Sequence, residues 1–66
     1  MAFQVGDRAA LKEDGAAPAG SCGTITKDYG DRHYDVEVTQ TAPPECKQLA
    51  IPVDAIYVQV VPCGCP

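Results

Sequence analysis

Four cysteines are the residues of this chain with the widest choice of chemistry. Cys63 and Cys65 form a Cys-x-Cys pair, while Cys22 and Cys46 stand singly. Together with His33 they contain enough ligands for a tetrahedral zinc site, so a soft metal on Cys63 and Cys65 is one hypothesis, and disulfides are another. The first residues show neither a basic nor an apolar leader segment. We therefore expect a cytoplasmic protein whose cysteines are free thiols with no bound metal.

Tyrosines and carboxylates form the second group of interest. Tyr29 and Tyr57 are expected near the rims of neighbouring loops, and Asp31 follows Tyr29 closely. Aromatic faces beside negative charge suit a basic or proline-containing peptide. We accordingly predict a ligand-binding groove at Tyr29, Tyr57 and Asp31. His33 stands between Asp31 and Asp35 and could serve as a general base, although a solvated histidine at the end of a strand is the favoured interpretation.

The elements that must position these side chains are short. Glycine and proline divide the sequence at a spacing typical of all-β domains, and no window keeps a helical apolar period. The clearest strand is 33–39, where Tyr34, Val36 and Val38 share one face and polar residues the other. Pro52 begins a segment that suits a single 3₁₀ turn. The predicted strands are 8–12, 22–29, 33–39, 47–51 and 57–61, with the 3₁₀ turn at 52–56.

Five short strands with a 3₁₀ turn before the last strand predict an SH3-like barrel. Residues 1–61 would form this one domain, and residues 62–66 a Cys- and Pro-containing tail. A domain of 66 residues buries little surface, so self-association would stabilise it. The expected core consists of aliphatic residues and one tyrosine, namely Val5, Leu11, Ile25, Tyr34, Val36, Val38, Leu49, Ile51, Val53, Ile56, Val58 and Val60.

The sequence also resembles one family of small barrels, the plasmid- and integron-borne type II dihydrofolate reductases. The resemblance covers most of residues 3–56. Its matching positions are Phe3, Gly6-Asp7-Arg8, Lys12, Gly15-Ala16-Ala17, Gly23, Ile25, Gln48-Leu49 and Pro52-Val53-Asp54-Ala55-Ile56.

That resemblance implies an SH3-like barrel and a tetramer around a central pore that holds NADPH beside the folate substrate. Lys12 would then attract the folate carboxylate, Gln48 would make the polar contact in the pore, and Leu49 the apolar one. The segment from Lys47 to Pro52 contains no tyrosine, whereas the pore segment of that family has one. Because a shared fold does not transfer chemistry, we keep an NADPH-dependent oxidoreductase as the alternative function.

Charge and hydropathy exclude several classes of partner. Nine Asp and Glu oppose five Lys and Arg, a net charge of −4, which disfavours contact with a polyanion such as nucleic acid. No apolar stretch is long enough to span a membrane. The sequence therefore predicts a small non-catalytic interaction module without a cofactor, whose partner is a second copy of itself or another protein or peptide.

Overall fold

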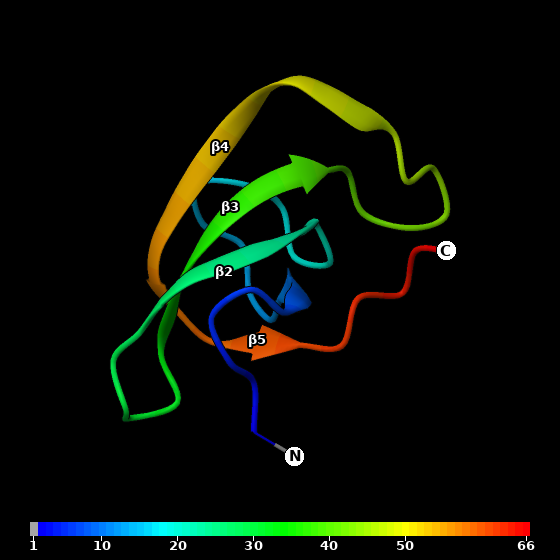
Figure 1. The fold of residues 1–66 in the computed structure, drawn as a ribbon. Coiled ribbons are helices and arrows are strands. Elements are labelled where there is room, and N and C mark those ends of the chain that lie inside the picture. Colours follow the sequence, from blue (N-terminus) through cyan, green and yellow to red (C-terminus); the bar gives the residue numbers. More distant parts are fainter. Residues whose placement is uncertain (1) are drawn as a thin grey trace.

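The computed structural model describes residues 2–66, which form an all-β protein. No helix long and apolar enough to cross a membrane occurs among these residues. Five strands lie in one antiparallel sheet in the order β4-β3-β2-β1-β5 (Figure 1). Their bounds are β1 (Arg8–Leu11), β2 (Cys22–Asp28), β3 (Tyr34–Gln40), β4 (Gln48–Val58) and β5 (Val60–Val61).

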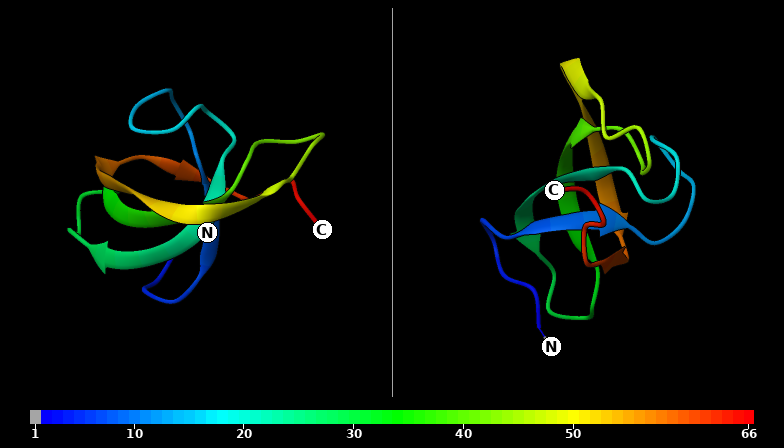
Figure 2. Two further views of the ribbon diagram at one scale, coloured as in Figure 1. Left: turned by 90° about the horizontal axis from the view of Figure 1, so that it is seen from above. Right: turned by 90° about the vertical axis from the view of Figure 1, so that its right-hand side faces the viewer.

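The sheet is strongly curved but it is not closed. Figure 2 shows the strands twisting and bending around the interior rather than lying flat. β4 and β5 form the two edges, and within the described residues they do not pair with each other. The five-stranded sheet of the predicted barrel is therefore not closed in this structure. The all-β class and the five antiparallel strands are confirmed.

The segment predicted as a 3₁₀ turn is extended. β4 runs without a break from Gln48 to Val58, and Pro52 lies inside it. The register of β4 against β3 shifts between the pairs Val38–Val53 and Gln40–Gln48. Pro52 falls within this irregular stretch of an edge strand, where proline is tolerated because its position need not donate a ladder hydrogen bond. The turn preference of Pro52 is thus outweighed by the pairing of β4 with β3 before it, at Gln48, and after it, at Val53.

The hairpin of β2 and β3 is the centre of the sheet. Its register is irregular next to Gly23, where a Cβ atom would lie 2.1 Å from the carbonyl oxygen of Glu37. Only glycine allows this approach of two backbones. At the tip, Asp28 Oδ1 accepts a hydrogen bond of 2.8 Å from the N–H of Gly30, whose φ of 82° favours glycine. These two glycines allow the close strand packing and the tight turn that place Tyr29 and His33.

The core confirms the alternation predicted for the third strand. Tyr34, Val36 and Val38 are buried, and so are Leu11 and Ile25. Four other predicted core residues, Leu49, Val53, Val58 and Val60, pack against this centre while partly exposed.

Three residues predicted for the core lie at the surface instead. Val5 is 59% exposed, Ile51 80% and Ile56 68%. Ile51 and Ile56 belong to β4, an edge strand with a neighbour on one side only. In Figure 1 the first half of β4 arches away from β3, and the register has no pair between Gln48 and Val53, the stretch that contains Ile51.

The prediction of free thiols is wrong for this structure, in which two disulfides hold the C-terminal segment. Cys22 pairs with Cys63, and Cys46 pairs with Cys65, so that no cysteine is free. β1 lies between β2 and β5, and Ala10 faces Cys22 on one side and Val61 on the other. That register carries Cys63 to Cys22. The lack of a leader segment carries no information about this proximity. The C-terminal segment predicted as a tail is bonded to β2 and to the 41–47 loop.

Candidate functional site

Aromatic and acidic side chains gather where the β2–β3 turn meets the end of β4. Tyr29 follows β2, Asp31 and His33 lie in the turn, Asp35 lies on β3, and Tyr57 lies near the end of β4. The pairing of Tyr34 with Val58 brings Tyr57 to the base of the turn. We call these five residues the aromatic–acid cluster. The structure thus places the three predicted ligand-binding residues, Tyr29, Tyr57 and Asp31, in one group.

Ring stacking organises the aromatic part of the cluster. The His33 and Tyr57 rings are stacked, with centroids 4.2 Å apart and planes 7° from parallel. Tyr29 meets Tyr57 edge-on, at 5.0 Å between centroids and 87° between planes. Both are preferred geometries for aromatic pairs. They hold the rings in place although Tyr29 remains 38% exposed and Tyr57 51% exposed.

Two carboxylates accept hydrogen bonds from the tyrosines. The Tyr57 hydroxyl donates to Asp31 Oδ2 at 2.6 Å, and the Tyr29 hydroxyl donates to Asp35 Oδ1 at 2.9 Å. Asp35 Oδ1 also accepts the backbone N–H of Tyr57 at 2.9 Å. That last bond supports an unusual backbone, because Tyr57 has a φ of 54°, which costs a residue other than glycine about 1 kcal/mol.

These hydrogen bonds lower the pKa of Asp31 and raise the pKa of both tyrosines. The bond from Tyr57 lowers the pKa of Asp31, because it stabilises the ionised carboxylate. The bond to Asp31, and after it desolvation, raises the pKa of Tyr57, and the bond to Asp35 does the same for Tyr29. At neutral pH the cluster therefore presents two protonated phenols, and one of them, Tyr57, donates to the negatively charged Asp31.

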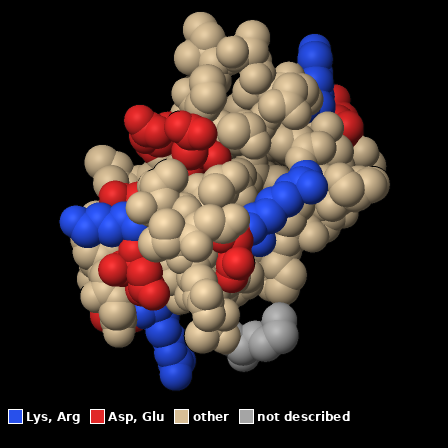
Figure 3. Space-filling view, in the orientation of Figure 1, with Lys and Arg blue, Asp and Glu red and all other residues tan. Residues whose placement is uncertain are grey.

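A small cavity adjoins the cluster. Its volume is about 190 Å³, and it is lined by Glu13, Asp14, His33, Tyr57, Val58 and Gln59. On the other side, Lys27 places its ammonium group over the Tyr29 ring, 4.7 Å from the centroid. In Figure 3 red acidic side chains are grouped on the left half of the face, with single blue basic side chains projecting from it. The lining of the cavity beside the stacked rings includes two acidic residues, Glu13 and Asp14, and no Lys or Arg.

Within residues 2–66, the residues that the reductase resemblance implies lie on different elements of the fold. Lys12 lies just beyond β1, where its backbone N–H donates to the carbonyl of Gln59 at 3.1 Å. Gln48 is exposed at the start of β4, opposite Gln40. Leu49 lines a separate cavity of about 400 Å³ whose ten lining residues do not include Lys12.

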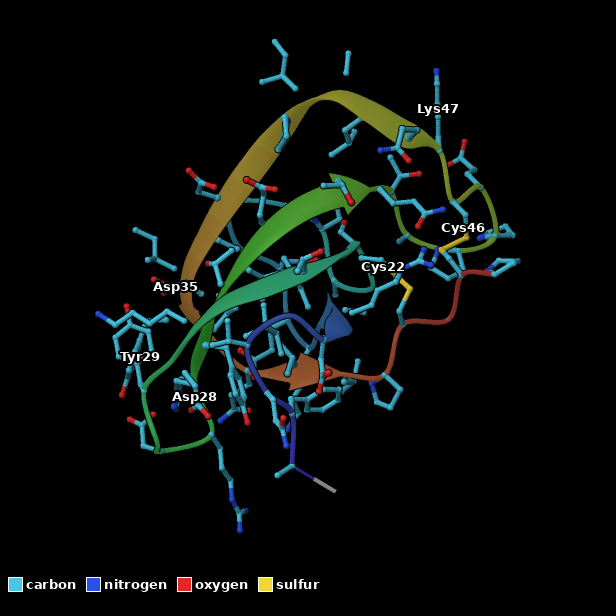
Figure 4. The ribbon with its side chains drawn as sticks, viewed as in Figure 1. Cys22, Asp28, Tyr29, Asp35, Cys46 and Lys47 are labelled. Carbon is cyan, nitrogen blue, oxygen red and sulfur yellow. A yellow bond between two sulfur atoms is a disulfide. The ribbon has the colours of Figure 1, made fainter. Side chains whose placement is uncertain are left out.

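His33 and the cysteines lie apart, which overturns the idea of a joint zinc site. His33 belongs to the aromatic–acid cluster, while Figure 4 shows Cys22 and Cys46 at the opposite end of the molecule from Tyr29. Cys63 and Cys65 are both engaged in disulfides here and offer no thiolate.

Sequence reasoning did not foresee the roles of His33 and Asp35 in the cluster. His33 stacks on a ring 24 positions later in the chain, and Asp35 binds two partners instead of facing solvent alone. The alternation along residues 33–39 contained a usable signal, since it puts both residues on the face opposite Val36. The missing information was the register that brings Tyr57 to that face.

No protein-family model, curated protein or solved structure matches this chain. Its function is therefore inferred from its own side chains and their geometry.

Proposed function

We propose that this protein is a non-catalytic interaction module that binds a cationic group of a partner protein or peptide at the aromatic–acid cluster. The observation that carries the proposal is the stack of His33 on Tyr57, hydrogen-bonded to the ionised Asp31 and open to the cavity beside Glu13 and Asp14. Aromatic rings and carboxylates together attract ammonium and guanidinium groups. The SH3-like class, in which rim aromatics bind peptides, is part of the same proposal.

Lys27 supports the choice of a cationic ligand. Its ammonium group lies over one face of Tyr29, which shows that a ring of the cluster attracts a cation, while the cavity beside His33 and Tyr57 is left for the cation of a ligand. The cavity is large enough for a guanidinium or ammonium head with part of its alkyl stem. The net charge of −4 adds a favourable long-range attraction for a basic partner.

The same hydrogen bonds argue for binding and against acid–base catalysis. A phenol whose pKa is raised stays protonated at neutral pH and is a poor general base. Asp31 and Asp35 accept hydrogen bonds from those phenols, so their lone pairs are already partly used.

A peptide titration tests the proposal. Addition of a capped Gly-Arg-Gly peptide should shift the NMR resonances of Tyr29, His33 and Tyr57, whereas capped Gly-Gln-Gly should not. Asp31→Asn should weaken binding roughly two- to fivefold, the contribution of an exposed charge pair. Glu45→Gln removes the same charge from the loop at the other end of the chain and should leave the affinity unchanged. Equal responses to both peptides, or equal losses in both variants, would refute the proposal.

Self-association is a second candidate, and the exposed edge of β4 favours it. Ile51 and Ile56 are 80% and 68% exposed on a strand with a free edge. Such an edge can pair with the same strand of a second copy, which would cover both side chains. Sedimentation should show a concentration-dependent dimer or larger species that Ile51→Lys abolishes. A monomer at the highest soluble concentration would rule this candidate out.

A further inference from the structure

The sulfur atoms of the four cysteines lie close together. The two disulfides arrive from different elements, one joining β2 to the C-terminal segment and the other joining that segment to the 41–47 loop. The Sγ atoms of Cys22, Cys63 and Cys65 all lie within 4.8 Å of one another. Cys46 Sγ is bonded to Cys65 Sγ and so adjoins the same group. We call these atoms the four-sulfur cluster.

This spacing is close to what a thiolate metal site requires. Zinc–sulfur bonds of about 2.3 Å put the four sulfurs of a tetrahedral site about 3.8 Å apart. The three sulfurs within 4.8 Å need only side-chain adjustments to reach that distance. The backbone does not have to bring ligands in from elsewhere, because β2, the 41–47 loop and the C-terminal segment already converge here.

The surroundings suit a negatively charged centre that a metal ion can reach. Arg8 lies with Cys63 and Cys65 on an open cavity of about 430 Å³, which provides an entry path. Its guanidinium donates to the Pro66 carbonyl and to Gln40, whose amide in turn donates to the Cys46 carbonyl at 2.8 Å. The backbone N–H of Cys65 points at Cys63 Sγ at 3.3 Å. A nearby guanidinium and an N–H donor both favour deprotonated thiolates.

We propose that reduction converts the four-sulfur cluster into a binding site for one thiophilic metal ion of the zinc type. Two equivalents of a dithiol, each oxidised to a disulfide, or of a phosphine, each oxidised to its oxide with oxygen from water, supply four electrons; four protons are taken up, and two disulfides become four thiols. One divalent ion then displaces the four protons and leaves a tetrathiolate complex of charge −2. The chain would thus have two alternative crosslinks at the same position, one covalent and one metallic, chosen by the redox state.

Cobalt provides the spectroscopic test, because Co²⁺ substitutes for zinc and is coloured. The full chain is reduced with a phosphine without oxygen, freed of reductant and titrated with CoCl₂. We expect saturation at one ion per chain, with thiolate-to-cobalt charge transfer and the visible bands of a tetrahedral site. Zinc should displace the cobalt, and the loaded chain should resist alkylation at all four thiols until a chelator is added.

Two comparisons make the result decisive. The double variant Cys46→Ser/Cys65→Ser keeps only two thiols after reduction and should lose the tetrahedral spectrum. Circular dichroism and NMR dispersion should show the β-sheet fold in the metal-loaded protein, as expected of a pre-assembled site. Absence of stoichiometric binding, the same spectrum from the double variant, or metal binding to an unfolded chain would each overturn the proposal.

Discussion

Removal of the disulfides one at a time should destabilise the chain unequally. The Cys22–Cys63 bridge spans 41 residues and the Cys46–Cys65 bridge spans 19. The loss of loop-closure entropy grows with the logarithm of the loop length and gives about 3.9 kcal/mol for the first bridge and about 3.2 kcal/mol for the second. For a domain of this size these values correspond to reductions of the melting temperature of roughly 15–30 °C and 13–25 °C.

The structure adds to this difference between the stability losses expected for the two bridges. Cys22 is fully buried, so its replacement also loses core contacts. Its bridge starts just after β5, which is held to β1 by only the two pairs Ala10–Val61 and Leu11–Val60. Without the Cys22–Cys63 bridge, β5 should fray from the sheet, whereas loss of the Cys46–Cys65 bridge frees mainly the 41–47 loop.

Thermal unfolding of two double alanine variants, followed by circular dichroism under non-reducing conditions, measures the difference. Cys22→Ala/Cys63→Ala should melt below Cys46→Ala/Cys65→Ala, and both should melt well below the unmodified chain. Hydrogen exchange at Val60 and Val61 should accelerate in the first variant only. The reverse order of melting temperatures, or a variant as stable as the unmodified chain, would refute this reasoning.

Four further predictions concern Gly23, Asp31 and Gln48. Gly23→Ala places a Cβ 2.1 Å from the Glu37 carbonyl and should destabilise the fold by on the order of 3 kcal/mol in a urea melt. The control Gly15→Ala meets no atom within 4 Å and should change stability by less than about 0.5 kcal/mol. In a spectroscopic titration of tyrosine ionisation, Asp31→Asn should bring the raised pKa of Tyr57 down towards its ordinary value; no change would show that Asp31 is not its cause. Because the pKa of Tyr57 is raised in the folded state, its protonation stabilises the fold up to a pH of about 10, and this stabilisation is lost as the pH rises through the pKa of the folded state. Because the pKa of Asp31 is lowered, its ionisation stabilises the fold above about pH 4, and this stabilisation is lost in more acidic solution. Asp31→Asn should therefore reduce the pH dependence of stability at both ends. The protein should not oxidise NADPH when dihydrofolate is added. If it does, and if Gln48→Ala abolishes the oxidation, the proposed interaction function is wrong and the reductase alternative is supported.

The sequence predicts burial best where the alternation of apolar and polar residues within one strand is enough to identify its buried face. The alternation of Tyr34, Val36 and Val38 needs no knowledge of neighbouring strands, and the structure buries all three. Ile51 and Ile56 follow equally apolar spacing, but their burial depends on whether something covers the strand, and β4 is an edge. The 3₁₀ turn predicted at Pro52 also fails because of a neighbouring strand. The pairing of β4 with β3 at Gln48 and Val53 outweighs the local turn preference of proline.

The candidate site shows the same division. Tyr29, Asp31 and Tyr57 could be chosen by residue type, because exposed aromatics beside carboxylates are a recognisable ligand surface. Their contact could not be foreseen, because it depends on the register between β3 and β4 and on the left-handed backbone of Tyr57. The pairing of the cysteines could not be predicted from the sequence either, because four cysteines allow three connectivities and their spacing does not choose among them.

The order of the cysteines along the chain also matters while the protein is being made. The two bridges interleave, because Cys46 lies between Cys22 and Cys63, and Cys65 lies beyond them. Synthesis from the N-terminus therefore presents Cys22 and Cys46 to each other before either has its own partner. A premature Cys22–Cys46 bond would have to be exchanged before the native pairs could form. The native pairs then form only after Cys63 or Cys65 attacks that bond, or when oxidation begins after the C-terminal cysteines are present.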